Sequence, residues 1–446
     1  MLVYENKAFR SLYLWTAITF CTALHSDSFF TTIYSIVDGI FVSNFVGKTA
    51  FAAVNFVMPI LILLASVGVM MGAGGSALVA KLLGEQNKVK ANQVFSMIVY
   101  TMFAFGIIVS IAASFFTENI VCFLGANGEL LTQATHYGRI AVLGGTAFIF
   151  QHIFYCFFIV AERPKLSFIV TVVAGVTNIL LDLVFIVILK WGISGAALAT
   201  VIGQMIGGTI PLVFFLLPNK TPLRLVKPSF DGSALLKTST NGISELVSNI
   251  AISVVSMLYN YQLIKFAGDT GVAAYGAIMY TSYIFSTVYM GYSFGRAPIV
   301  SYHYGASNTD ELKNLFRKDL VIVIFAGFLL TSISEILAYP LAYIFGSYDP
   351  DLFKMIRHGI YIYSFAYLLM GVNYAGSSFF TALNNGLVSG LISFFRTFLF
   401  EILAVLTLPI AFGVDGIWAS TVVAEVASFI FTAACLVRYR KKYGYY

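Results

Sequence analysis

The chain has 446 residues, of which 59% are hydrophobic and only 10% are charged. A soluble protein carries about a quarter charged residues, and the mean hydropathy here is +0.87. The composition excludes a soluble protein and predicts a chain embedded in a membrane. A transmembrane β-barrel is also excluded, because the apolar runs are unbroken and do not alternate with polar residues.

A membrane-spanning helix needs about 20 mostly apolar residues. Windows of this kind cover nearly the whole chain and leave no room for a soluble domain. They lie at residues 12–43, 51–80, 92–116, 134–161, 166–189, 193–217, 238–264, 272–302, 316–345, 356–382, 386–411 and 414–437. We therefore predict an all-α polytopic membrane protein with about 12 transmembrane helices.

The two halves of the chain repeat each other. Residues 45–95 align without a gap onto residues 266–316, so that Gly47 matches Gly268, 221 residues later. The same offset relates Gly192 to Gly413. Weak internal symmetry in an apolar chain is typical of transporters built from two repeats, with a site between them.

Each half holds about six spans, and an even number gives both halves the same orientation in the membrane. We therefore expect two parallel six-helix bundles that face a shared cavity. The first is expected at residues 1–217 and the second at residues 238–446. Residues 218–237, with three prolines and four basic residues, are expected to form a cytoplasmic linker.

The formal net charge of +6 is explained by topology. With the N-terminus inside, basic residues on the cytoplasmic side outnumber those outside by about three to one, as the positive-inside rule requires. We predict a multi-pass protein of the plasma membrane with both termini in the cytoplasm. The charge therefore does not indicate a nucleic-acid partner.

A carboxylate at the centre of a spanning helix costs several kcal/mol, so each one needs a reason. The candidates among the acidic residues of the predicted spans are Asp27, Asp38, Asp182, Glu245, Glu335, Glu401 and Glu425. The alternatives are structural residues inside the bundles and functional groups that face water. We favour the structural interpretation for Glu335 and Glu425.

Polar residues of the first half form stripes on three predicted helices. Asp38 lies one turn after Tyr34, and Asp27 lies close to three turns deeper on the same face. These side chains are expected to face the interior of the first bundle.

Two further stripes carry pairs of polar residues four apart, which makes them neighbours on one helix face. Asn178 and Asp182 lie in the fifth span, and Thr200 and Gln204 lie in the sixth. We expect them to form facing walls of a wet pocket with Asp38. Two carboxylates in a poorly solvated site are expected to take up protons or to hold a cation between them.

The second half has a stripe of its own in the seventh span. Asn241, Glu245 and Asn249 follow each other at one-turn spacing, and Asn373 in the tenth span is placed opposite them. We expect these residues to line the substrate cavity, together with Tyr34, Asp27 and Gln204.

Several short motifs occur together along the chain. They are Val37-Asp38-Gly39-Ile40-Phe41-Val42, Gly84-Glu85-Gln86-Asn87, Asn178-Ile179-Leu180-Leu181-Asp182, Gly192-Ile193-Ser194-Gly195-Ala196-Ala197 and Arg296-Ala297-Pro298-Ile299-Val300. In this combination the chain resembles the multidrug and toxic compound extrusion (MATE) transporters over nearly its whole length. The resemblance implies two six-helix lobes and antiport of cationic drugs against protons or sodium.

The resemblance also implies roles for single residues. The proton-coupled, damage-inducible-like branch of the family uses an acidic cluster in its first lobe. The residues of that cluster match Asp38, Asn178, Asp182 and Thr200, and a tyrosine that opens the fourth span matches Tyr137. If the coupling ion is Na⁺, the first four residues are its implied ligands.

A sodium-coupled branch relies instead on acids of the second lobe. Glu245 resembles the glutamate of its seventh span, but Asn373 stands where the tenth span of that branch has an aspartate. This departure puts coupling through the second lobe in doubt. The register of the repeat points the same way, because Asp38, Asn178 and Asp182 fall on Tyr259, Leu399 and Leu403 in the second half.

We therefore expect a secondary active exporter of cationic amphipathic compounds that works by alternating access. It should act as a monomer in the lipid bilayer, with no cofactor besides the coupling ion H⁺ or Na⁺. A lipid-linked saccharide flippase of the same superfamily is the nearest alternative, but it would need basic residues in its cavity, and only Arg296 and Arg396 lie more than five residues inside a span. A membrane-embedded enzyme is a remote alternative, because the five histidines show no metal-ligand spacing.

Overall fold

The computed structural model describes residues 37–446 except residues 40, 124, 125 and 348, and it leaves undescribed the side chains of residues 48, 253 and 269. The described chain is almost wholly helical and has no strand. It divides into two compact units at the boundary between Gly242 and Ile243. The all-α fold expected from the sequence is confirmed.

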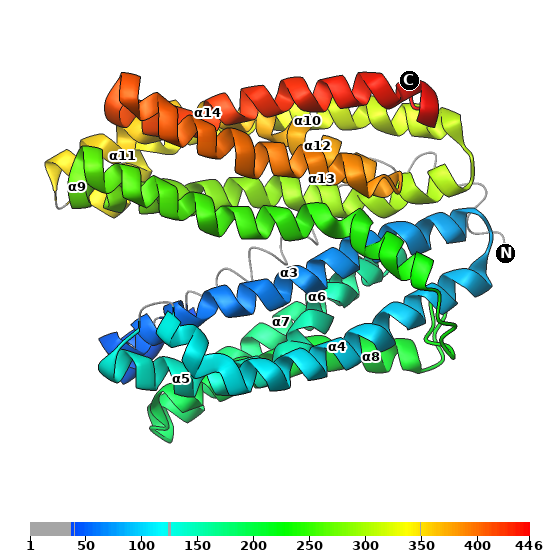
Figure 1. Ribbon diagram of the computed structural model, residues 1–446, viewed down its shortest axis with the longest axis horizontal. Coiled ribbons are helices and arrows are strands. Elements are labelled where there is room, and N and C mark those ends of the chain that lie inside the picture. Colours follow the sequence, from blue (N-terminus) through cyan, green and yellow to red (C-terminus); the bar gives the residue numbers. More distant parts are fainter. Residues whose placement is uncertain (1–36, 40, 124–125, 348) are drawn as a thin grey trace. The chain divides into compact units, whose positions relative to one another are not determined.

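The first unit consists of long helices that pack against one another (Figure 1). A π-helical turn η1 (Val42–Val46) precedes α3 (Lys48–Gly84), α4 (Lys88–Phe123), α5 (Gly128–Leu143), α6 (Gly145–Val160), α7 (Pro164–Asp182), the π-helical turn η2 (Leu183–Ile188) and α8 (Gly192–Leu216). The bend between α5 and α6 is 52°. These two helices together form the predicted fourth span.

The second unit has a similar order of elements, with an additional 3₁₀ turn. After α9 (Gly232–Gly305) come α10 (Thr309–Gly346), α11 (Pro350–Tyr363), the 3₁₀ turn η3 (Ser364–Ala366), α12 (Tyr367–Ala382), α13 (Gly386–Phe394), the π-helical turn η4 (Phe395–Phe400) and α14 (Glu401–Tyr443). Non-helical backbone at Gly268 divides α9, and non-helical backbone at Gly413 divides α14. Figure 1 shows α9 doubling back along the unit.

Seven helices in the described residues are long and apolar enough to cross a membrane, or eight if the bent pair α5 and α6 counts as one span. With α9 and α14 each divided at a glycine, every predicted span from the second to the twelfth corresponds to helical chain. The predicted first span lies mostly outside the described residues.

The repeat is visible in the backbone angles as well as in the sequence. Gly192 and Gly413 have φ of 59° and 58°, and Gln86 and Ser307 have φ of 61° and 55°. Both pairs are separated by the offset of 221 residues found in the sequence. Positive φ is uncommon outside glycine, so its recurrence at matched turns supports duplication of a whole helical unit.

The connection between α8 and α9 belongs to the first unit. The backbone amide of Arg224 donates to the Asn92 side chain at 2.7 Å, and that of Val226 donates to Ser96 Oγ at 2.8 Å, which holds the connection against α4. Helix α9 then begins at Gly232, whereas the sequence predicts a linker at residues 218–237 and a seventh span from residue 238. The boundary differs because the last polar residues of the expected linker already form the first turns of the helix.

Each unit has its own core. In the first unit, the buried rings of Phe95, Phe154, Phe157 and Phe215 contact one another, with centroids 4.7 Å apart for Phe95 and Phe157. The core of the second unit contains more phenols. These fixed cores allow each unit to hold polar side chains in defined positions within an apolar environment.

Candidate functional site

Three helices and the segment before η1 bring polar side chains together in the first unit. Tyr137 comes from α5, Asn178 and Asp182 from α7, and Thr200 from α8. Asp38 lies in the helical residues 37–39. The carboxyl groups of Asp38 and Asp182 lie close enough to interact electrostatically, and the Tyr137 hydroxyl lies near Thr200 and both carboxyl groups. The structure thus joins residues that are up to 162 positions apart in the sequence.

The cluster is buried. The exposed fraction is 0% for Asp182, 1% for Tyr137, 4% for Asn178 and 7% for Asp38. An isolated charge at such a position is costly unless it is paired or neutralised by a proton. In the described residues, the ion pairs of the first unit lie elsewhere, at Lys81–Glu85 and Arg139–Glu118.

Several oxygens of the cluster lack a hydrogen-bond partner in the described chain. Both carboxylate oxygens of Asp182, Oδ1 of Asp38, Oδ1 of Asn178, Oγ1 of Thr200 and the Tyr137 hydroxyl receive no hydrogen bond from the described chain. Ionised carboxylates and amide oxygens can only accept hydrogen bonds. Oxygens gathered in this way are suited to share added protons or to coordinate a monovalent cation.

Local packing explains how these oxygens meet. Asn178 and Asp182 are one turn apart on α7, and the π-helical turn η2 begins directly after Asp182. Gly203 on α8 allows close approach, because a Cβ there would lie 3.1 Å from Asn178 Cβ and 3.2 Å from the Ala174 carbonyl oxygen. Gln204 follows in the next position and is also buried.

The residues predicted to line the cavity from the second half do not form a cluster like that of the first unit in the contacts described. Glu245 and Asn249 lie on α9, where the Asn249 amide donates to the backbone carbonyl of Glu245 at 2.8 Å. Asn241 is buried on the same helix. Asn373 is buried in α12 and donates to Glu425 Oε2 at 2.6 Å. The predicted cavity residues Tyr34 and Asp27 lie outside the described residues.

The structure also reveals acidic contacts that sequence reasoning missed. The Oε1 atom of Glu401, for which no partner was predicted, accepts hydrogen bonds from Tyr259 at 2.6 Å and from Thr421 at 2.7 Å. Asp319 was not among the candidates, and it pairs with Arg296 in the interior of the second unit. The repeat could have indicated the contact of Glu401 with Tyr259 and Thr421, because Tyr259 and Thr421 are the repeat counterparts of Asp38 and Thr200.

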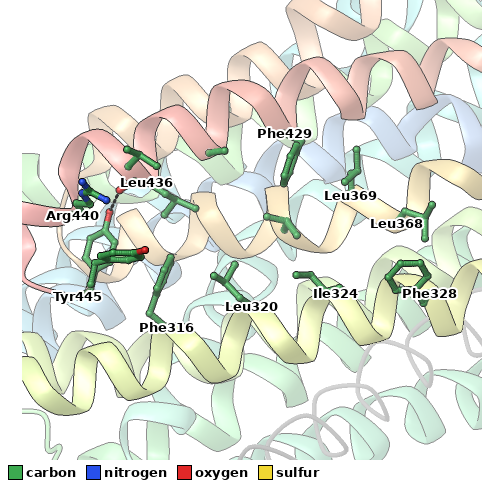
Figure 2. Close-up of a pocket in the computed structure, with 14 residues that line it drawn as sticks. Phe316, Leu320, Ile324, Phe328, Leu368, Leu369, Phe429, Leu436, Arg440 and Tyr445 are labelled. Carbon is green, nitrogen blue, oxygen red and sulfur yellow. Dashed lines mark hydrogen bonds between the residues drawn. The ribbon is translucent and has the colours of Figure 1, made fainter.

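Two observations bear on other kinds of site. Among the described residues, no group of three or more His, Cys, Asp and Glu side chains could hold a metal ion. A groove of about 580 Å³ opens between α10, α12 and α14. Figure 2 shows its lining of apolar side chains such as Phe316, Ile324 and Phe429, with Arg440 at one end. None of the predicted site residues line this groove.

The comparisons with known proteins agree with this architecture. A family model described as MatE matches the chain twice, once in each half, at residues 27–184 and 246–406. The chain belongs to the MatE family. The two matches lie in the two repeats.

The chain is similar to curated relatives named multidrug export protein MepA. The protein of Staphylococcus haemolyticus is 24% identical over 429 residues, which cover 96% of this chain and 93% of the relative. That of Staphylococcus saprophyticus is 26% identical over 69% of this chain and 68% of its own length. A multidrug resistance MATE family transporter solved in an outward-facing conformation has a TM-score of 0.88, with 19% identity, and the match covers 98% of this chain and 100% of that one. The latter likeness shows a shared fold.

Proposed function

We propose that this chain is a secondary active multidrug exporter that exchanges cationic amphipathic compounds for H⁺ or Na⁺ by alternating access. The coupling site in this proposal is the first-unit cluster of Asp38, Asn178, Asp182, Thr200 and Tyr137. The observation that carries the proposal is the group of buried oxygens that lack hydrogen-bond donors in the described chain. Membership of the MatE family and the names of the relatives support the choice of cargo.

The cluster provides a physical basis for exchange. Asp38 and Asp182 have the same charge and are buried side by side, so binding of one cation or proton stabilises them and weakens the attraction for a second. A cationic substrate and the coupling ion then compete for the same negative charge, and by linkage each lowers the affinity for the other. Ion binding from outside releases the substrate there.

The energy available is sufficient for export. Exchange of one coupling ion for one singly charged compound moves no net charge, so the concentration gradient of the ion drives this exchange, and the membrane potential adds about 2.3 kcal/mol per 100 mV only for each further coupling ion. A free-energy difference of about 1.4 kcal/mol corresponds to a factor of ten in concentration. A tenfold concentration gradient of a single coupling ion therefore supports a tenfold concentration ratio of the exported compound.

The structure offers less support for the two alternatives. A lipid-linked saccharide flippase would need positive charge free to bind pyrophosphate, but Arg296 pairs with Asp319, and Arg396 pairs with Glu425 at 2.7 Å. For an enzyme, the described histidines belong to no group of three or more possible metal ligands. His152, for example, bonds to the Phe148 carbonyl oxygen of its own helix.

The proposal is tested by Asp182→Asn, which keeps the size of the side chain and removes its charge. Efflux of a cationic dye driven by an ion gradient should be abolished, while the purified protein stays folded and monodisperse. Asp310→Asn is the matched control, because Asp310 is an exposed carboxylate in the first turn of α10. Full transport by Asp182→Asn would exclude the first-unit cluster as the coupling site.

A further inference from the structure

Three oxygens in the second unit form a closed triangle. Tyr259 on α9 lies 2.6 Å from Glu401 Oε1 and 2.8 Å from Thr421 Oγ1, and Thr421 Oγ1 lies 2.7 Å from the same carboxylate oxygen. Tyr259 and Thr421 are buried, while Glu401 is only partly buried. The two hydroxyl groups therefore fix the geometry of the Glu401 carboxylate, and the residue remains partly exposed.

The triangle occupies the position of the first-unit cluster in the second copy of the repeat. Tyr259 and Thr421 lie 221 residues after Asp38 and Thr200. Glu401 belongs to the eleventh span, the counterpart of the fifth span that carries Asp182. It stands two residues before the register position of Asp182, and its contact with Tyr259 corresponds to the proximity of Asp182 and Asp38. The repeat thus places one carboxylate at matched sites in both units, although on different residues of the register.

The number of hydrogens that the triangle needs indicates whether Glu401 is protonated. Three oxygen contacts of hydrogen-bond length need three hydrogens, but a tyrosine and a threonine hydroxyl supply one each. With Glu401 ionised, one contact joins two oxygens without a hydrogen between them. With Glu401 protonated, each oxygen donates one hydrogen bond and accepts one, so that all three contacts are satisfied.

The distances favour a proton over a metal cation. Mg²⁺ binds its oxygens at about 2.1 Å in an octahedron, which keeps neighbouring oxygens about 3.0 Å apart, and larger cations need more space. The three oxygens here are 2.6 to 2.8 Å apart. Distances in this range are normal for O–H···O hydrogen bonds.

None of the charged and titratable groups described around the triangle provides a positive charge that is free to neutralise Glu401. Arg396 of η4 is already paired with Glu425 of α14 through two nitrogens, at 2.8 and 2.7 Å. From α9, Tyr275 stacks on Tyr259 with ring centroids 5.0 Å apart. Tyr363 faces the triangle from α11 and bonds to Ser282 at 3.0 Å. These phenols are polar but carry no positive charge to neutralise Glu401.

We propose that Glu401, Tyr259 and Thr421 form a second proton-binding site, the repeat counterpart of the first-unit cluster. The site takes a proton from water onto Glu401 Oε1 and returns it during the transport cycle. The inference rests on the proposed antiport function and adds one proton to the exchange. It assigns a distinct coupling role to the second unit.

The decisive experiment is a measurement of proton-to-substrate stoichiometry in proteoliposomes. An ethidium gradient is balanced against an imposed pH difference of one unit, with the membrane potential clamped at zero, until net flux stops. Loss of one exchanged proton lowers the ethidium gradient at zero flux by about tenfold. Wild type, Glu401→Gln, Asp182→Asn and Glu335→Gln are compared. Glu335→Gln is the matched control, because Glu335 also accepts a hydroxyl hydrogen bond, from Ser364, inside the second unit.

The inference predicts that Glu401→Gln still transports but reaches a balance gradient about tenfold smaller, whereas Glu335→Gln matches wild type. A Glu401→Gln gradient equal to wild type would overturn it, as would a wild-type gradient that does not respond to pH. Failure of the proposed function gives a different result, namely full pH-driven transport by Asp182→Asn.

A second measurement covers the case in which Glu401→Gln does not fold. Proton release into weakly buffered detergent solution is recorded when ethidium is added to the double variant Asp38→Asn/Asp182→Asn, which has lost both carboxylates of the first cluster. Continued release supports the second site. Absence of any release overturns it.

Discussion

At the scale of single residues, the two units hold their carboxylates in different ways. Asp182 lies among oxygens that lack donors in the described chain, whereas Glu425 is bonded to Arg396 and Asn373. Removing one partner of a buried ion pair leaves an uncompensated charge, which costs about 3–5 kcal/mol. The first kind of carboxylate is suited to binding a mobile ion, and the second to holding helices together.

This difference leads to a prediction about Arg396. Arg396→Met should destabilise the purified protein by about 3–5 kcal/mol, because Glu425 loses its buried partner. The double variant Arg396→Met/Glu425→Gln should recover most of the loss. Thermal unfolding in detergent measures both. Equal stability of wild type and the single variant would contradict the structural assignment of this pair.

A second prediction concerns Asp38 and Asp182 as a unit. If they share one coupling site, Asp38→Asn and Asp182→Asn should each abolish ion-driven efflux, and the double variant should show the same phenotype without a further decrease in ethidium binding. The affinity is measured by fluorescence at low ionic strength. Independent, additive losses of affinity would show two separate sites.

At the scale of elements, glycines determine how closely the helices approach and where they bend. Gly203 brings α8 against α7 beside Asn178, and Gly413 provides the positive φ that divides α14. Sequence patterns indicated the helices and the repeat because apolar spans and matched glycines are local signals. They did not indicate that Glu401 meets Tyr259, because Tyr259 is uncharged and Glu401 stands two residues before the register position of Asp182.

Gly203→Val tests the helix contact. The added side chain would collide with Asn178 and Ala174, and overpacking of this kind costs about 1–3 kcal/mol. We expect a lower melting temperature and loss of efflux, since α7 carries both Asn178 and Asp182. Gly276→Ala is the control, because a Cβ there meets nothing within 4 Å. Normal transport by Gly203→Val would show that the spacing of α7 and α8 is unimportant.

Gly413→Ala tests the bend by itself. A Cβ at this position contacts nothing within 4 Å, so the cost comes only from the φ of 58°. Left-handed backbone costs a non-glycine residue about 1–2 kcal/mol. Thermal unfolding should show a loss of that size. An unchanged melting temperature would mean that the backbone at Gly413 can adopt another conformation.

At the scale of the whole molecule, the duplicated chain yields two units with matched turns and separate cores. The sequence was sufficient to predict the membrane class, the repeat and the polar residues of the first cluster. The sequence was less informative about the interior of the second unit, because the carboxylate there, Glu401, is two residues away from the repeat counterpart of Asp182. Duplication conserved the helical framework, while the positions of the ionisable groups diverged.

Membrane orientation gives a prediction at this scale. With both termini in the cytoplasm, the third span would carry the end of α4 to the outside. Cys122 is exposed there, and a membrane-impermeant maleimide should label it in intact cells. Cys122→Ser should lose this label. Labelling that requires permeabilised cells would reverse the proposed topology.

The central claim is that buried carboxylates of the first unit couple export to an ion gradient. The most direct test is ethidium transport by purified protein in proteoliposomes, with a pH gradient and a Na⁺ gradient imposed separately. We expect wild type to respond to at least one gradient and Asp182→Asn to respond to neither, with Asp310→Asn behaving as wild type. Gradient-driven transport by Asp182→Asn at the wild-type rate would contradict the account.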